Sequence, residues 1–115
     1  MRNVKIERLN GIILKEVTDI IQFSLKDPNV GFVTITDVQV SNDHSYATVY
    51  VSFLGKKERN EAGLKALNRG KGFIRSELAK RLSIRRVPEL TFKLDESYEK
   101  ARHLDEIIET IHKND

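Results

Sequence analysis

The chain has 115 residues, of which 39% are hydrophobic and 32% charged, a balance typical of one soluble globular domain with a modest core. It contains no cysteine, which excludes disulfides, thiolate metal sites and a cysteine nucleophile. The N-terminal stretch has no unbroken apolar run long enough for a signal peptide or a membrane span. We therefore expect a cytoplasmic protein with no membrane partner.

The positive charge is concentrated in one middle segment. Residues 56–86 carry 11 basic and 3 acidic side chains, whereas residues 1–55 carry 5 and 6, and residues 87–115 carry 4 and 8. The net charge of +3 therefore hides a strongly basic region between two acidic ones. Clustered basic charge is the electrostatic footprint of a polyanion binder, and the simpler alternative is a solvated helix face.

The first predicted element is an amphipathic helix from about residue 3 to 25. It ends before Pro28, because a residue that precedes a proline avoids helical torsions. Its apolar residues recur at three- and four-residue steps: Ile6, Leu9, Ile13, Val17 and Ile20.

A β-hairpin is predicted next. Two runs rich in β-branched residues, 32–40 and 46–54, are separated by the polar turn 41–45. The apolar alternation changes phase within the first run, which indicates a β-bulge near Asp37.

Helical periodicity resumes from about residue 57 to 84, and a short third strand follows within 87–97. A last helix carries an apolar stripe after Ser97, which is a plausible N-cap. The predicted order is α-β-β-α-α-β-α, an α+β domain without repeats or linkers.

Gly70 and Gly72 flank Lys71 inside the second helical region. In one straight helix, Lys71 would lie in the middle of the apolar stripe, which is formed by Leu64, Leu67, Ile74, Leu78 and Leu82. Burying an unpaired ammonium is costly, and each glycine weakens a helix by about 1 kcal/mol, so we expect a kink that turns Lys71 outward. The kink would also present backbone N–H groups that suit a phosphate. The simpler alternative is a tight helix–helix turn.

We therefore predict an RNA-binding surface around the kink and the basic residues after it. The predicted site residues are Arg69, Gly70, Lys71, Gly72, Arg75, Lys80, Arg81, Arg85 and Arg86. The three histidines are scattered, and we find no convergent acid, base or metal ligands, so we expect no enzyme activity, no metal and no cofactor.

Two other classes stay open. A DNA-binding helix-turn-helix is weakened because residues 75–86 contain no Asn or Gln to read adenine. A small nucleic-acid enzyme is weakened by the lack of convergent catalytic groups. The acidic C-terminal helix is either a solvated surface or a cover that competes with RNA for the basic region.

Two helices joined by a glycine-bearing break, after a hairpin and before a third strand, resemble a KH domain of the α-β-β-α-α-β (type II) kind. KH domains hold nucleic-acid backbone with a GXXG loop, whereas this chain has the shorter Gly70-Lys71-Gly72. Longer stretches are similar to the ribosome-binding factor A family of bacterial assembly factors: LKDPNVGFVTITDVQVSNDHSYATVYVSFLG (25–55) and KGFIRSELAKRLSIRRVPELTFKLDES (71–97). That family replaces the KH loop by a kink bearing Ala-x-Gly, and here Gly70 stands at the alanine position.

The resemblance implies one KH-like RNA-binding domain over residues 1–115, with a C-terminal helical extension from about 95 to 115. It implies a three-stranded sheet packed by helices on one face. It also implies a monomeric, non-catalytic factor that binds 16S rRNA and the free 30S subunit, supports 5′-end processing of 16S rRNA and matters most in the cold. The alternative is a general KH-type or helix-turn-helix nucleic-acid-binding module.

Overall fold

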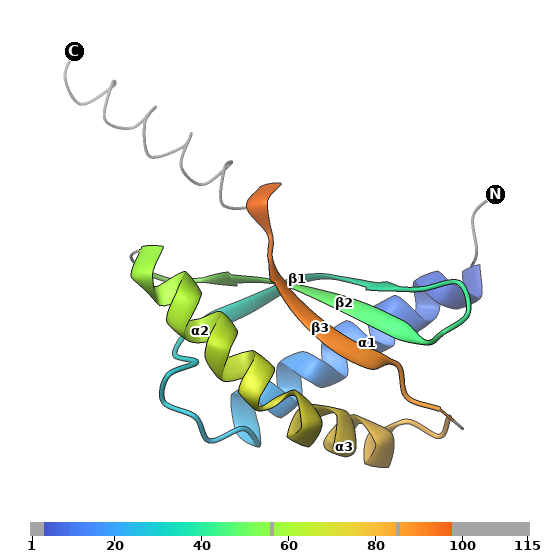
Figure 1. The fold of residues 1–115 in the computed structure, drawn as a ribbon. Coiled ribbons are helices and arrows are strands. Elements are labelled where there is room, and N and C mark those ends of the chain that lie inside the picture. Colours follow the sequence, from blue (N-terminus) through green and yellow to red (C-terminus); the bar gives the residue numbers. More distant parts are fainter. Residues whose placement is uncertain (1–3, 56, 85, 98–115) are drawn as a thin grey trace.

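The computed structural model describes residues 4–55, 57–84 and 86–97, and the predicted C-terminal helix lies outside them. Within the described ranges three helices and three strands follow one another (Figure 1): α1 (Val4–Phe23), β1 (Val33–Val40), β2 (Tyr46–Phe53), α2 (Lys57–Arg69), α3 (Lys71–Arg81) and β3 (Glu89–Leu94). The predicted α+β class is confirmed, and so is the predicted order of elements as far as β3.

The strands form one sheet in the order β1-β2-β3. β1 and β2 are the antiparallel hairpin, and their register shifts between Ile35 and Asp37, which is the predicted bulge. β2 and β3 are parallel, with Tyr46 opposite Glu89 at their first pair. A parallel pair cannot be joined by a tight turn, so α2 and α3 supply the connection between these strands.

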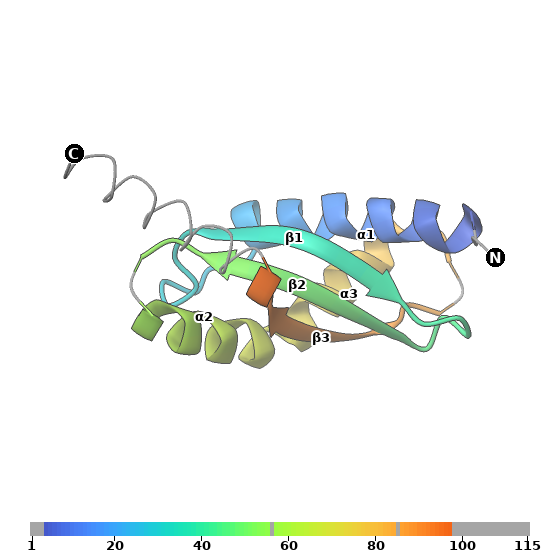
Figure 2. The same cartoon turned by 90° about the horizontal axis from the view of Figure 1, so that it is seen from above.

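One face of the sheet carries the core. Ala47 and Val49 of β2 are buried, and they lie opposite Leu90 and Phe92 of β3, which are buried as well. The helices that the structure describes pack on this face: α1 against β1, α2 against β2 and β3, and α3 against β3 and α1. Figure 2 shows α3 behind the sheet, with α1 and α2 along its two sides. The arrangement leaves the first turn of α3 at the surface.

Candidate nucleic-acid interface

α2 and α3 meet at Gly70, where the sequence predicts a kink. The Gly70 N–H still donates to the Ala66 carbonyl at 3.0 Å, and the Ile74 N–H donates to the Gly70 carbonyl at 3.0 Å. Gly70 has φ −88° and ψ 2°, which residues other than glycine also adopt. Its small size matters more, because a Cβ there would lie 3.0 Å from Cδ1 of Leu25. The break is therefore a close helix–helix junction against the end of α1.

Lys71 and Gly72 are exposed on the first turn of α3. Ile74 and Leu78 are fully buried, so the apolar side of α3 reaches the core while Lys71 faces outward, as predicted. The N-cap of α3 is Gly70, which provides no side-chain hydrogen bond to the first turn. A Cβ on Gly72 would meet nothing within 4 Å, so the backbone at this turn is open to a ligand. An uncapped first turn next to a lysine suits a phosphate group.

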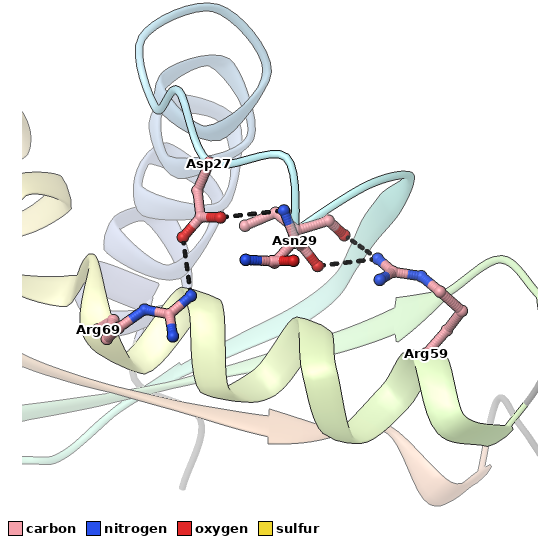
Figure 3. Close-up of polar contacts among 5 residues, drawn as sticks. Asp27, Asn29, Arg59 and Arg69 are labelled. Carbon is pink, nitrogen blue, oxygen red and sulfur yellow. Dashed lines mark hydrogen bonds and ion pairs between the residues drawn. The ribbon is translucent and has the colours of Figure 1, made fainter.

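Two arginines of α2 hold the loop between α1 and β1 (Figure 3). The Arg59 guanidinium donates to the carbonyls of Asn29 at 3.0 Å and Val30 at 2.7 Å. Arg69 donates to Oδ2 of Asp27 at 3.3 Å, and the Asn29 N–H donates to Oδ1 of Asp27 at 2.9 Å. The Asn29 N–H and, after it, Arg69 lower the pKa of Asp27. Arg69 keeps 63% of its side chain exposed, so it can still face a ligand.

Arg81 joins α3 to α1. Its Nη1 donates to Oδ2 of Asp19 at 2.5 Å and to Oε2 of Glu16 at 3.0 Å. These carboxylates, Asp19 first and then Glu16, raise the pKa of Arg81. Only 29% of the Arg81 side chain is exposed. Because two carboxylates neutralise it, we expect Arg81 to contribute less to polyanion binding than its place in the basic segment suggests.

The remaining predicted residues differ in how they are held. Arg75 donates to the Val87 carbonyl at 2.8 Å and thereby fixes the segment before β3. Lys80 pairs with Glu77 at 3.2 Å but stays 70% exposed, and such surface pairs contribute little stability. Arg86 is exposed, and Arg85 lies outside the described residues.

Arg86 lines a cleft together with Lys5 and Arg8 of α1. These two α1 residues are functional candidates that the sequence reasoning missed as members of one surface. The basic start of the N-terminal helix is visible in the sequence. Its position beside the chain segment after α3 follows only from the packing of α1 against α3.

The turn between β1 and β2 closes the same cleft through Asp43 and His44. Oδ1 of Asp43 accepts hydrogen bonds from the Ser41 hydroxyl at 2.7 Å and from the Ser45 N–H at 3.0 Å. These two bonds lower the pKa of Asp43 to about 2. His44 has a φ of 62°, in the left-handed region that residues other than glycine rarely adopt. The turn therefore holds His44 in a defined position.

In the part of the chain that the structure describes, no group of three or more His, Asp or Glu side chains is placed to hold a metal ion. None of the helices in that part is both long enough and apolar enough to cross a membrane.

Residues 5–108 match the sequence model of the family described as Ribosome-binding factor A. The chain belongs to this family. The ribosome-binding factor A of Staphylococcus epidermidis is 44% identical over 115 residues, which are 100% of this chain and 99% of that protein. The predicted family resemblance is thereby confirmed.

Solved structures of ribosome-binding factor A share the fold. The crystal structure of the Thermus thermophilus protein is 30% identical, with a TM-score of 0.69, and the match covers 77% of this chain and 94% of that one. A homology model of Thermus thermophilus ribosome-binding factor A, fitted into the cryo-EM map of a 30S complex, is 31% identical, with a TM-score of 0.62, over 73% of this chain and 88% of that one.

Proposed function

We propose that the chain is an assembly factor of the small ribosomal subunit. It binds 16S rRNA in the immature 30S subunit and supports maturation of the rRNA 5′ end without catalysing a reaction. The observation that carries this proposal is the uncapped, exposed first turn of α3 beside Lys71, in a chain whose family includes a member fitted into a 30S complex. The protein works in the cytoplasm as a monomer, with 16S rRNA and the free 30S subunit as its partners.

The order of elements and the helix–helix junction support a KH-like domain of type II in which a kink replaces the usual loop. In this domain the first turn of α3 receives an rRNA phosphate through its backbone N–H groups, and Lys71 adds a point charge. The basic residues Arg69, Arg75 and Arg86 extend the contact on either side. The contact reads backbone shape more than sequence, as suits a protein that recognises a folded RNA.

Assembly support follows from differential binding. A protein that binds one rRNA conformer better than its competitors shifts the population toward that conformer, and no hydrolysis or group transfer is needed. Low temperature stabilises wrong RNA pairings, so the factor matters most in cold cells.

The alternative is a general nucleic-acid-binding module of the KH or helix-turn-helix type. A helix-turn-helix must place its second helix in the major groove of DNA. Ile74 and Leu78 of α3 are buried, which leaves the other side of α3 exposed, and residues 75–86 carry no Asn or Gln to read adenine in a groove. A single-stranded RNA and a DNA duplex of matched length separate the two modules, because a KH-type module binds the single strand and a helix-turn-helix binds the duplex.

Co-sedimentation tests the proposal directly. The protein should sediment with free 30S subunits and with their precursors more than with translating ribosomes, because messenger and tRNA occupy the mature subunit. Lys71→Ala should weaken binding and flatten the log–log salt dependence by about 0.7, the value for one phosphate contact on a single strand. Lys65→Ala is the matched control, since Lys65 is exposed on α2, where it pairs with Glu61 of the same helix. Equal binding to free subunits and translating ribosomes would contradict the proposal.

A further inference from the structure

The cleft at the N-terminal end of α1 combines an apolar floor with a basic rim. Its volume is about 510 Å³, which lies within the roughly 300–1,000 Å³ of small-ligand sites. In both cartoons the first turn of α1, the β1–β2 turn and the chain between α3 and β3 lie at the same end of the molecule (Figures 1 and 2). The cleft therefore lies at a corner that three separate segments build.

The floor exposes large aliphatic side chains. Ile12 of α1 is 47% exposed and Ile84, after α3, is 40% exposed, and both line the cleft with Leu9. Leu9 packs against the hydrophobic core, so the floor is fixed to the body of the protein. Apolar surface that stays open next to charged groups commonly marks a binding site.

The rim is basic. Three exposed cations line the cleft: Lys5, Arg8 and Arg86. Among the residues that line it, the acidic one is Asp43. Oδ1 of this carboxylate already accepts two hydrogen bonds within its own turn. The cations come from α1 and from the segment before β3, so folding is required to bring them together. An anion with an apolar part is the ligand class that this combination fits.

The β1–β2 turn adds an aromatic ring at the edge of this floor. His44 lines the cleft, and its backbone is held in the left-handed region by a turn that its own N–H closes on the Ser41 carbonyl at 2.9 Å. Strained positions of this kind persist where the surrounding structure over-determines them, and they are frequent at ligand sites. Imidazole rings and guanidinium groups both stack on unpaired bases.

We propose that this cleft takes one unpaired nucleotide of a structured RNA. The base lies on Ile12 and Ile84 beside His44, and the flanking phosphates meet Lys5, Arg8 and Arg86. A nucleotide joins a flat apolar face directly to negative charge, which is the combination that the floor and the rim of the cleft offer. The site rests on the proposed function, and it extends the contact from the kink through Arg86 to the far end of α1.

Two matched RNA hairpins test the proposal, one fully paired and one with a single bulged adenosine in the same stem. Wild-type protein should bind the bulged hairpin about tenfold tighter, the effect of one stacked base. Ile12→Gln and Ile84→Gln should each reduce this preference while leaving affinity for the paired hairpin unchanged. The double variant Lys5→Gln/Arg86→Gln should bind both the bulged and the fully paired hairpin more weakly. Lys65→Gln should not weaken binding to either hairpin by a comparable factor.

His44→Gly separates ligand contact from folding. Glycine adopts a φ of 62° without strain, so this variant should unfold at the same or a higher denaturant concentration than wild type. It should nevertheless lose part of the bulge preference, because the ring is gone. Loss of stability with an unchanged preference would show that His44 only shapes the turn.

The outcomes distinguish the cleft from the proposed function. If wild type prefers neither hairpin, but Lys71→Ala still weakens both and 30S binding persists, the cleft is not a nucleotide site and the function stands. If a poly-glutamate peptide displaces the bulged hairpin and shifts the NMR methyl signals of Ile12 and Ile84 equally, the cleft is a peptide site and the proposal is overturned. If neither RNA nor 30S subunits bind, the proposed function itself fails.

Discussion

The arginines along α2 and α3 differ from the cations around the cleft in what surrounds their charge. Arg59 and Arg81 donate to backbone carbonyls and carboxylates of the α1 region, and Arg81 keeps only 29% of its side chain exposed. Lys5, Arg8 and Arg86 instead face solvent at the edge of a cleft. The basic segment of the sequence therefore mixes side chains that hold the fold with side chains that are available to a ligand.

The difference has a physical basis in the chemistry of arginine. Its planar guanidinium donates several hydrogen bonds at once, so it can hold a loop or join two helices where lysine would leave acceptors unpaired. Counting charges along the sequence cannot separate the two uses. Only the acceptors that the fold places next to each guanidinium can do so.

The largest expected effect comes from Arg59→Ala. This change removes the hydrogen bonds to the Asn29 and Val30 carbonyls. Asn29 is exposed, so water can replace the first bond, but Val30 is buried, so water does not easily replace the second. We expect a loss of about 1–3 kcal/mol in the free energy of unfolding, the usual cost of a buried acceptor left unpaired. Urea denaturation followed by circular dichroism measures it.

Lys65→Ala serves as the control for Arg59→Ala, because Lys65 lies on the same helix with 73% of its side chain exposed. It should change the free energy of unfolding by less than about 0.5 kcal/mol. If both variants unfold at the same urea concentration, the Arg59 contacts do not stabilise the loop and the division between structural and available arginines is wrong at this position.

A second pair of variants compares Arg81 with Arg86. Arg81→Ala leaves Glu16 and Asp19 without their partner, so its unfolding midpoint should fall while the salt dependence of rRNA binding stays near that of wild type. Arg86→Ala should unfold as wild type does and flatten the log–log salt slope by about 0.7. Fluorescence anisotropy with a 16S rRNA fragment at several salt concentrations gives the slopes.

The opposite result would contradict the distinction between Arg81 as a structural residue and Arg86 as a residue available to RNA. If Arg81→Ala flattens the slope and Arg86→Ala does not, the ion pairs of Arg81 open when RNA binds. Its carboxylate partners would then compete with phosphate. The double variant Arg85→Ala/Arg86→Ala, expected to flatten the slope by about one to two units, shows whether Arg85 shares the contact.

The parts of this molecule that the sequence predicts are those that local periodicity decides. The phase change near Asp37 predicts the bulge, and the glycines flanking Lys71 predict the junction, because each depends on neighbours within a few residues. The Arg81 pairs join residues more than 60 positions apart, and the cleft joins three segments. No spacing rule links such positions, so the sequence alone could show neither the ion pairs of Arg81 nor the place of Lys5 and Arg8 in the cleft.

The last prediction concerns Gly70 and Gly72. Both flank Lys71 in the sequence, but their surroundings differ in the structure. At Gly72 a Cβ would meet nothing within 4 Å, so Gly72→Ala should gain part of the helix propensity of alanine, about 0.5–1 kcal/mol. At Gly70 a Cβ would press on Leu25 at 3.0 Å, so Gly70→Ala should gain less or lose stability. Urea denaturation of both variants measures the difference.

RNA binding then shows what the small residue at position 72 is for. If a phosphate approaches the backbone of the first turn of α3, the added methyl group of Gly72→Ala lies in its path. The variant should therefore be more stable than wild type and yet bind a 16S rRNA fragment more weakly. A variant that is stabilised and binds as tightly as wild type would show that the phosphate lies elsewhere. Gly72 would then be needed neither for the junction nor for binding, and the RNA contact would have to lie elsewhere, with the cleft as the next candidate.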